Sequence, residues 1–236
     1  MKLTERLDKI FYKDFEKNWD NLLVSQKVRK NINKDTVLLD LGAGAGIIGF
    51  MNFKGVAKKV IGVDLDERVK NNPFLDEAHV SSIENMPFIP DHSCDVVVCN
   101  NVFEHIAAPE KVFSEVARIL KSGGLFIAKT PNKYHYVPLI ASLTPDSFHK
   151  YINRKRGRND DDTFPTLYKL NTENDQRRTA EKTGFDLLEI EHIEGRPEYL
   201  RMNPATYMVG IAYERIVNCL GIESLKVILL STFRKR

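Results

Sequence analysis

Short apolar runs alternate with amphipathic segments along the first half of the chain. The runs lie at residues 37–41, 60–65, 95–100 and 125–130, and they are rich in valine, leucine and isoleucine. Continuous runs of this kind are typical of strands that are buried on both faces of a parallel sheet. Residues 111–120 instead repeat apolar side chains at helical spacing and end at a Ser-Gly-Gly sequence. This alternation predicts an α/β fold with a doubly wound, mostly parallel sheet.

The N-terminal segment, residues 1–35, precedes the first run. It has apolar side chains at steps of three to four residues, namely Leu3, Leu7, Ile10, Phe11, Phe15 and Trp19. This spacing predicts a helical segment that packs on the body of the domain.

The chain changes character after the fourth run. Residues 133–170 are aromatic, basic and punctuated by prolines, and we expect this insertion to be a lid, because long irregular excursions inside compact domains are usually functional. Residues 171–236 then predict a helix over 175–183, a strand over 185–194 and a last strand over 226–235. We therefore expect one domain over residues 1–236, with its core at residues 36–132.

Composition places the chain among ordinary folded proteins. Hydrophobic residues make up 42% and charged residues 28% of the 236 positions, which disfavours a disordered, collagen-like or disulfide-rich protein. The 35 basic and 32 acidic residues leave a net charge of +3, too little to indicate a nucleic acid or membrane partner. The three cysteines, Cys94, Cys99 and Cys219, form no metal-binding pattern, and no apolar stretch approaches the length of a membrane span. We expect a cytoplasmic protein with no metal.

The first apolar run ends in a glycine-rich loop, where we expect the chemistry. Asp40 is followed by Gly42, Gly44 and Gly46 at alternate positions. A loop between a strand and a helix N-terminus needs glycines where φ is positive or where a ligand touches the main chain. The window from Gly44 to Gly49 also fits G-x-G-x-x-G, so a nicotinamide-dependent oxidoreductase stays an alternative.

The order of motifs resembles the class I S-adenosylmethionine-dependent methyltransferases, of the type 11, ubiquinone-biosynthesis-like branch. The acidic-x-G-x-G-x-G motif reads Asp40 to Gly46, and the acidic residue after the second strand is Asp64. The later motifs of the family are similar to ENMPFIPDHSCDVVVCNNVFEHI and LKSGGLFIAKTPN, so the resemblance covers about residues 36–132. It implies a Rossmann-like seven-stranded sheet with an antiparallel last strand.

The resemblance also implies a cofactor, S-adenosylmethionine, whose product is S-adenosylhomocysteine. Asp64 would hold the ribose hydroxyls, since a carboxylate accepts two hydrogen bonds. Many relatives have an aspartate for adenine where this chain has Ser82, so the Ser82 hydroxyl, the Ile83 main chain or Glu84 would replace it. The expected cofactor-binding residues are Asp40, Gly42, Gly44, Gly46, Asp64, Leu65, Ser82, Ile83 and Asn100.

Two histidines are the candidates for a general base. His105 follows the third apolar run and His149 lies in the insertion, and a neutral imidazole accepts a proton near neutral pH. A base is needed only where the acceptor carries a proton of high pKa, because alignment alone accelerates methyl transfer. Tyr134, His135, Tyr136 and Tyr168 are aromatic and imidazole side chains that would line a pocket or pack the lid.

The sequence therefore predicts methyl transfer from S-adenosylmethionine to an oxygen of a small molecule, lipid or saccharide precursor. A nucleic acid partner is less expected, because there is no appended basic domain and no amino-directed N/D-P-P-Y/F signature. A non-catalytic scaffold that binds the cofactor is the alternative outside the enzymes. The oligomeric state is left open.

Overall fold

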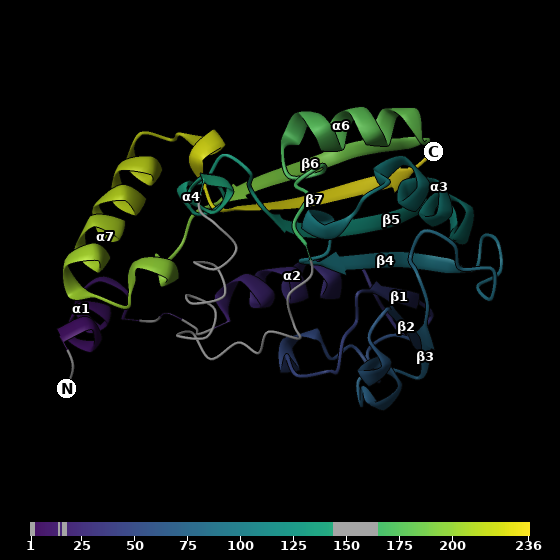
Figure 1. Cartoon of the computed structure of the whole chain (residues 1–236). Coiled ribbons are helices and arrows are strands. Elements are labelled where there is room, and N and C mark those ends of the chain that lie inside the picture. Colours follow the sequence, from purple (N-terminus) through teal and green to yellow (C-terminus); the bar gives the residue numbers. More distant parts are fainter. Residues whose placement is uncertain (1–2, 14, 16–17, 144–164) are drawn as a thin grey trace. The chain divides into compact units, whose positions relative to one another are not determined.

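A computed structural model describes residues 3–13, 15, 18–143 and 165–236. Its centre is a seven-stranded sheet in the order β3-β2-β1-β4-β5-β7-β6 (Figure 1). The strands are β1 Val37–Leu41, β2 Lys59–Asp64, β3 Glu77–Val80, β4 Cys94–Asn100, β5 Leu120–Pro131, β6 Phe185–Ile193 and β7 Ile228–Lys235. The pairs β1–β2, β2–β3, β1–β4 and β4–β5 are parallel, and the last strands pair antiparallel. The predicted mixed, doubly wound sheet is confirmed.

The helices within the described ranges are α1 Leu3–Phe11, α2 Trp19–Arg29, α3 Pro109–Ile119, α4 Tyr136–Leu143, α6 Glu173–Lys182 and α7 Pro204–Cys219. The N-terminal pattern thus corresponds to two helices. No residue of α1 is buried, whereas α2 buries Asn21, Val24, Ser25 and Val28. Short 3-10 helices are η1 Gly49–Met51, η2 Glu67–Asn71, η3 Phe103–His105, η5 Glu198–Leu200 and η6 Glu223–Leu225.

The connection after the glycine loop differs from the expectation. We expected a helix to begin there, but the chain passes from β1 to β2 through η1 alone, which is three residues long. The sequence explains this, because Gly49, Asn52 and Gly55 lie close together and all disfavour a helix interior. The segment is held by α2 instead, since the Ser25 hydroxyl donates to the carbonyl of Phe50 at 2.6 Å.

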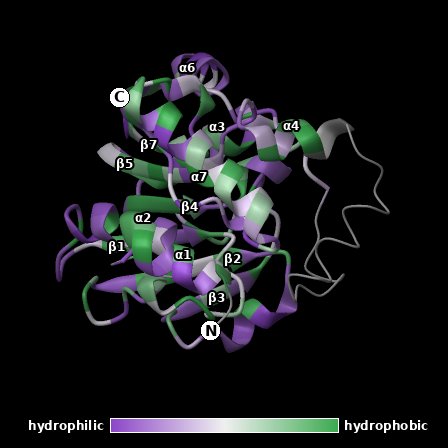
Figure 2. Ribbon diagram, turned by 90° about the vertical axis from the view of Figure 1, so that its left-hand side faces the viewer, coloured by the Kyte–Doolittle hydropathy of each residue, from purple (hydrophilic) through white to green (hydrophobic). Residues whose placement is uncertain are grey.

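An aromatic cluster joins the later strands to the sheet core. The rings of Phe103, Phe113, Phe126, Phe185 and Phe233 pack with centroid distances of 5.2 to 6.2 Å, and each residue is fully buried. α3 contributes its predicted apolar face to this cluster through Phe113. Figure 2 shows β4 mostly in the colour of hydrophobic residues, whereas the polar α6 is largely hydrophilic.

The chain divides into two compact units. One consists of residues 18–130, 166–191 and 229–236 and holds most of the sheet. The other consists of residues 1–17, 131–165 and 192–228, in which the Tyr207 hydroxyl of α7 donates to Asp8 of α1 at 2.5 Å. A single methyltransferase domain over the whole chain stays a prediction. Most of the insertion, residues 144–164, lies outside the described residues, so its role as a lid also stays a prediction.

Candidate functional site

The glycine loop adopts a conformation that other residues avoid. Gly42 and Gly44 have φ values of +73° and +56°, in the left-handed region. A Cβ at Gly42 would lie 2.3 Å from Cγ2 of Val102, so the backbone there is packed tightly. A Cβ at Gly44 would have no atom of the described chain within 4 Å. The main chain at Gly44 therefore faces open space, as a cradle for a ligand requires.

Asn72 fixes the shape of this loop. Its side-chain amide donates to the carbonyls of Ala43 and Gly44 at 3.0 and 3.1 Å, and the residue is only 8% exposed. The Asn72 side chain also lies directly against Gly46. Asn72 belongs to none of the motifs in the sequence, and the one local signal is that an Asn-Pro pair shortly after a strand indicates a turn.

Two carboxyl groups flank the loop. Asp40, at the end of β1, is 6% exposed; its burial and, secondarily, the charge of Asp64 raise the pKa of Asp40 to about 7. Asp64 ends β2, and its two oxygens accept hydrogen bonds from the main-chain N–H groups of Gly44 at 2.8 Å and Asp66 at 2.9 Å. Each carboxylate oxygen has a second lone pair, so Asp64 retains capacity to accept from a ligand.

The residues expected near adenine have different exposures. Leu65 follows Asp64 and is 62% exposed, whereas Ile83 packs partly against the hydrophobic core. Ser82 is exposed, and its hydroxyl oxygen accepts from the N–H of Glu84 at 3.2 Å. The adenine contacts of these residues stay predictions.

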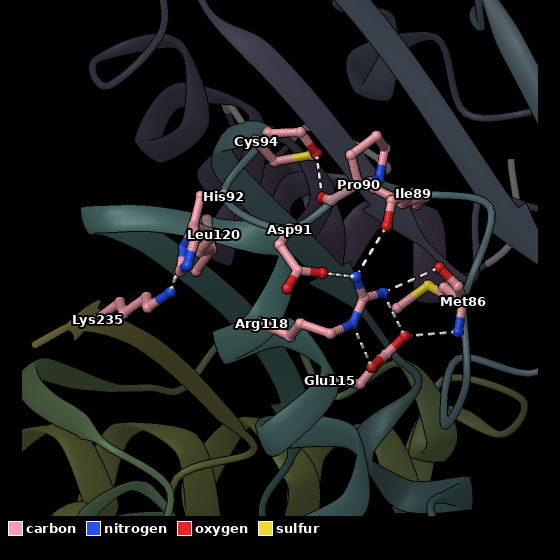
Figure 3. Close-up of polar contacts among 11 residues, drawn as sticks. Met86, Ile89, Pro90, Asp91, His92, Cys94, Glu115, Arg118, Leu120 and Lys235 are labelled. Carbon is pink, nitrogen blue, oxygen red and sulfur yellow. Dashed lines mark hydrogen bonds and ion pairs between the residues drawn. The ribbon is translucent and has the colours of Figure 1, made fainter.

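The turn that follows them is tied to α3 by Arg118 (Figure 3). The Arg118 guanidinium donates to the carbonyls of Met86 and Ile89 and to the carboxylates of Asp91 and Glu115. The Glu115 carboxylate in turn accepts from the N–H of Met86 at 2.6 Å. These contacts raise the pKa of Arg118 above its ordinary value and lower that of Glu115. α3 therefore sets the position of the segment after Glu84.

The carboxyl ends of β4 and β5 bring polar side chains together. Asn100 on β4 lies opposite Lys129 on β5. The Lys129 ammonium is almost fully buried and donates to Asp20 at 2.5 Å and to Asn21 at 3.2 Å, both on α2. Burial lowers the pKa of Lys129, and the charge of Asp20 opposes this. The local signal for this contact is a lysine within the apolar run LFIAKT, which no motif explains.

The Glu104 side chain is buried and makes structural hydrogen bonds, so it is not an accessible general base. The Thr130 hydroxyl donates to its carboxylate at 3.2 Å, and the Asn171 amide donates to Thr130 at 2.6 Å. The Glu104 main-chain carbonyl accepts from the N–H of Leu167 at 2.6 Å. Burial raises the pKa of this carboxyl. Glu104 thus anchors the segment that re-enters the sheet unit after the insertion.

These contacts do not show which histidine acts as the general base. His105 is half-buried in η3, which follows β4, and its role as a base stays a prediction. His149 lies outside the described residues. In the other unit, His135 is buried with its ring 4.1 Å from that of Tyr136, and burial lowers the pKa of His135 to about 4. Its Nε2 faces Oε2 of buried Glu194 at 3.6 Å.

Among the described residues, no group of three or more histidine, cysteine and acidic side chains is arranged to hold a metal ion. Within the same ranges, no helix has the length and apolar character to cross a membrane. Cys94 and Cys99 are buried in β4 as free thiols, as the sequence predicts.

Comparisons with known proteins agree on the central segment. Residues 39–128 match the family described as "Methyltransferase domain". A probable S-adenosylmethionine-dependent methyltransferase of Mycolicibacterium smegmatis is 36% identical over 106 residues, 43% of this chain and 40% of that protein. The uncharacterized methyltransferase YcgJ of Bacillus subtilis is 33% identical over 128 residues, 50% of this chain and 47% of its own length. The chain thus spans less than half the length of these two relatives.

Solved structures agree on the fold. The crystal structure of YcgJ has a TM-score of 0.58 at 19% identity and covers 93% of this chain and 99% of its own. Geranyl diphosphate C-methyltransferase of Streptomyces coelicolor, crystallised with S-adenosylhomocysteine, has a TM-score of 0.57 at 15% identity, over 92% of this chain and 80% of its own. The central segment, residues 39–128, is thus similar to S-adenosylmethionine-dependent methyltransferases over less than half of this chain, and the solved structures show the same fold.

Proposed function

We propose that this protein binds S-adenosylmethionine at the glycine loop and transfers its methyl group to an oxygen of a small molecule, lipid or saccharide precursor. The observation that carries the cofactor part is the cradle itself. The main chain at Gly44 faces open space, and Asp64, with acceptor capacity to spare, lies beside it. The match of residues 39–128 to the methyltransferase family supports the same proposal.

The residues of the cradle fit the parts of this cofactor. Asp64 would accept from the ribose hydroxyls, and exposed Leu65, Ile83 and Ser82 would hold the adenine. The positive-φ loop from Gly42 to Gly46 lets the ligand approach the main chain closely. Asp40 lies buried beneath, and Asn100 lies at the end of β4.

S-adenosylmethionine supplies a methyl group that is already activated by its sulfonium sulfur. The chain has therefore to align the acceptor and exclude water, which in favourable cases lowers a barrier by roughly 7 to 11 kcal/mol. An alcohol acceptor also has to lose its proton, and His105 in η3, the 3-10 helix that follows β4, is our first candidate for receiving it. His149 is the second candidate from the sequence.

We propose an oxygen acceptor and the ubiquinone-biosynthesis-like branch because the chain has a short core and an insertion at residues 133–170. One neighbour argues for testing the reaction directly. The [4+2]-cyclase SpnF has a TM-score of 0.58 at 14% identity, so proteins of this fold include one that is named for a reaction other than methyl transfer. A non-catalytic or differently catalytic cofactor protein is therefore the second candidate.

The test uses S-adenosylmethionine with a deuterated methyl group. The full chain is incubated with small-molecule, lipid and polysaccharide fractions of its source cells, and products are analysed by mass spectrometry. We expect the label in an ether or ester of one fraction, and none with Asp64→Ala. Label on nitrogen, sulfur or carbon would contradict the oxygen acceptor. Label in no fraction, despite cofactor binding, would favour the second candidate.

A further inference from the structure

A chain of hydrogen bonds at the carboxyl ends of β4 and β5 has a defined direction. It begins at Lys129, whose ammonium is a donor only, and it reaches Oδ1 of Asn21 at 3.2 Å. The amide of Asn21 must therefore present its oxygen. The Asn100 amide nitrogen donates to the same oxygen at 2.8 Å, so the carbonyl of Asn100 points away from Asn21.

The last atom in this series of hydrogen bonds is an acceptor without a donor. Oδ1 of Asn100 is buried and has no hydrogen-bond partner among the described residues. A buried acceptor without a donor is destabilising, so native structures rarely keep one without a reason. Asn100 ends β4, at the edge where parallel α/β sheets bind their ligands.

The chemistry of the Asn100 oxygen selects the kind of partner. The side-chain oxygen of Asn100 is an acceptor only, so its partner has to bring a hydrogen-bond donor. The nearby cation, Lys129, is already paired with Asp20. An ammonium, which is a donor only, therefore suits the Asn100 oxygen, whereas an ionised carboxylate or phosphate offers only acceptors and does not.

We propose that Lys129, Asn21 and Asn100 form a hydrogen-bond relay that presents Oδ1 of Asn100 to the ammonium group of the methyl donor. This inference rests on the proposed function. Asn100 contacts the ligand, whereas Asn21 and Lys129 are positioning residues that act through it. Without them the Asn100 amide turns freely, and it offers its nitrogen or its oxygen with little preference.

The test compares two probes by titration calorimetry: S-adenosylhomocysteine, and its analogue in which hydrogen replaces the amino group. We expect the unmodified protein to bind the deamino analogue at least about 10-fold more weakly, as is typical for a hydrogen bond to a charged group. The ratio of the two dissociation constants, deamino analogue over S-adenosylhomocysteine, falls to about 2-fold or less in Asn21→Leu and in Lys129→Met. Asn21→Asp retains the acceptor oxygen and with it the ratio of the unmodified protein.

Asn31→Leu is the matched control, because exposed Asn31 follows α2 and its amide donates to the carbonyl of Lys27. Its ratio should equal that of the unmodified protein. If Asn21→Leu does not fold, Asn100→Leu provides the same comparison from the other end of the relay. An unchanged ratio in a folded Asn21→Leu or Asn100→Leu overturns the relay. A failure of the unmodified protein to bind S-adenosylhomocysteine overturns the proposed function instead.

Discussion

Gly44 and Gly42 occupy the same loop but are constrained for different reasons. Gly44→Val puts a side chain into the open cradle, so we expect S-adenosylhomocysteine affinity to fall at least about 10-fold. The positive φ also costs about 1 to 2 kcal/mol of stability. Gly42→Ala meets Val102 instead, so its main effect is on folding.

Calorimetry and denaturant unfolding of the two variants separate these effects. Gly42→Ala combined with Val102→Ala should recover part of the stability that Gly42→Ala loses, because the contact at 2.3 Å involves a methyl group of Val102. Unchanged affinity in folded Gly44→Val would contradict a cofactor cradle at this glycine.

Asp40 makes stability depend on pH. Its folded-state pKa is raised to about 7, above the value near 4 of an unfolded chain, because the carboxyl is buried. The native state therefore keeps a proton that the unfolded state has lost. The free energy of unfolding falls as pH rises from about 4 to about 7, by at most about 1.4 kcal/mol per pH unit from this group.

Asp40→Asn should remove this component, so stability relative to the unmodified protein increases with pH across that range. Urea unfolding at several pH values measures it, with Asp35→Asn as a control at an exposed aspartate. A constant difference between Asp40→Asn and the unmodified protein would show that Asp40 is already ionised in the native state.

At the scale of elements, α3 holds the turn from Met86 to Asp91 through one side chain. Arg118→Met removes the guanidinium donor from the carbonyls of Met86 and Ile89 and from the carboxylate of Glu115. Hydrogen bonds to a charged group contribute about 1.5 to 3 kcal/mol each, so we expect a loss of at least about 2 kcal/mol in denaturant unfolding. Arg177→Met, which removes an exposed pair with Glu173 on α6, should lose less than about 0.5 kcal/mol. Equal losses would contradict the assigned role of Arg118.

The strands were predictable where their side chains are apolar on both faces. β1, β2, β4 and β5 follow the four apolar runs, because only buried parallel strands tolerate such sequences. β3 was not located by this pattern, since it is a half-buried edge strand with polar Glu77 and His79 among its four residues. The absence of a helix after β1 also escaped the pattern, because three helix-disfavouring residues act locally without a strong turn signal.

At the scale of the whole molecule, local motifs predicted the candidate site. The contacts between residues that are far apart in the sequence could not be predicted. Asp40, Gly44 and Asp64 belong to motifs that can be read along the chain. Lys129 and Asn21 are separated by 108 positions, and no local pattern indicates that they meet. The same holds for His135 and Glu194 in the second unit. Nε2 of His135 and Oε2 of Glu194 lie 3.6 Å apart.

The central claim is that this chain binds the methyl donor at its glycine loop. Titration calorimetry of the full chain with S-adenosylhomocysteine and, separately, with NAD tests it most directly. We predict saturable binding of S-adenosylhomocysteine at one site per chain, strongly weakened in folded Asp64→Ala, and no measurable heat with NAD. Binding of NAD without S-adenosylhomocysteine, or affinity for S-adenosylhomocysteine that is unchanged in Asp64→Ala, would contradict the account.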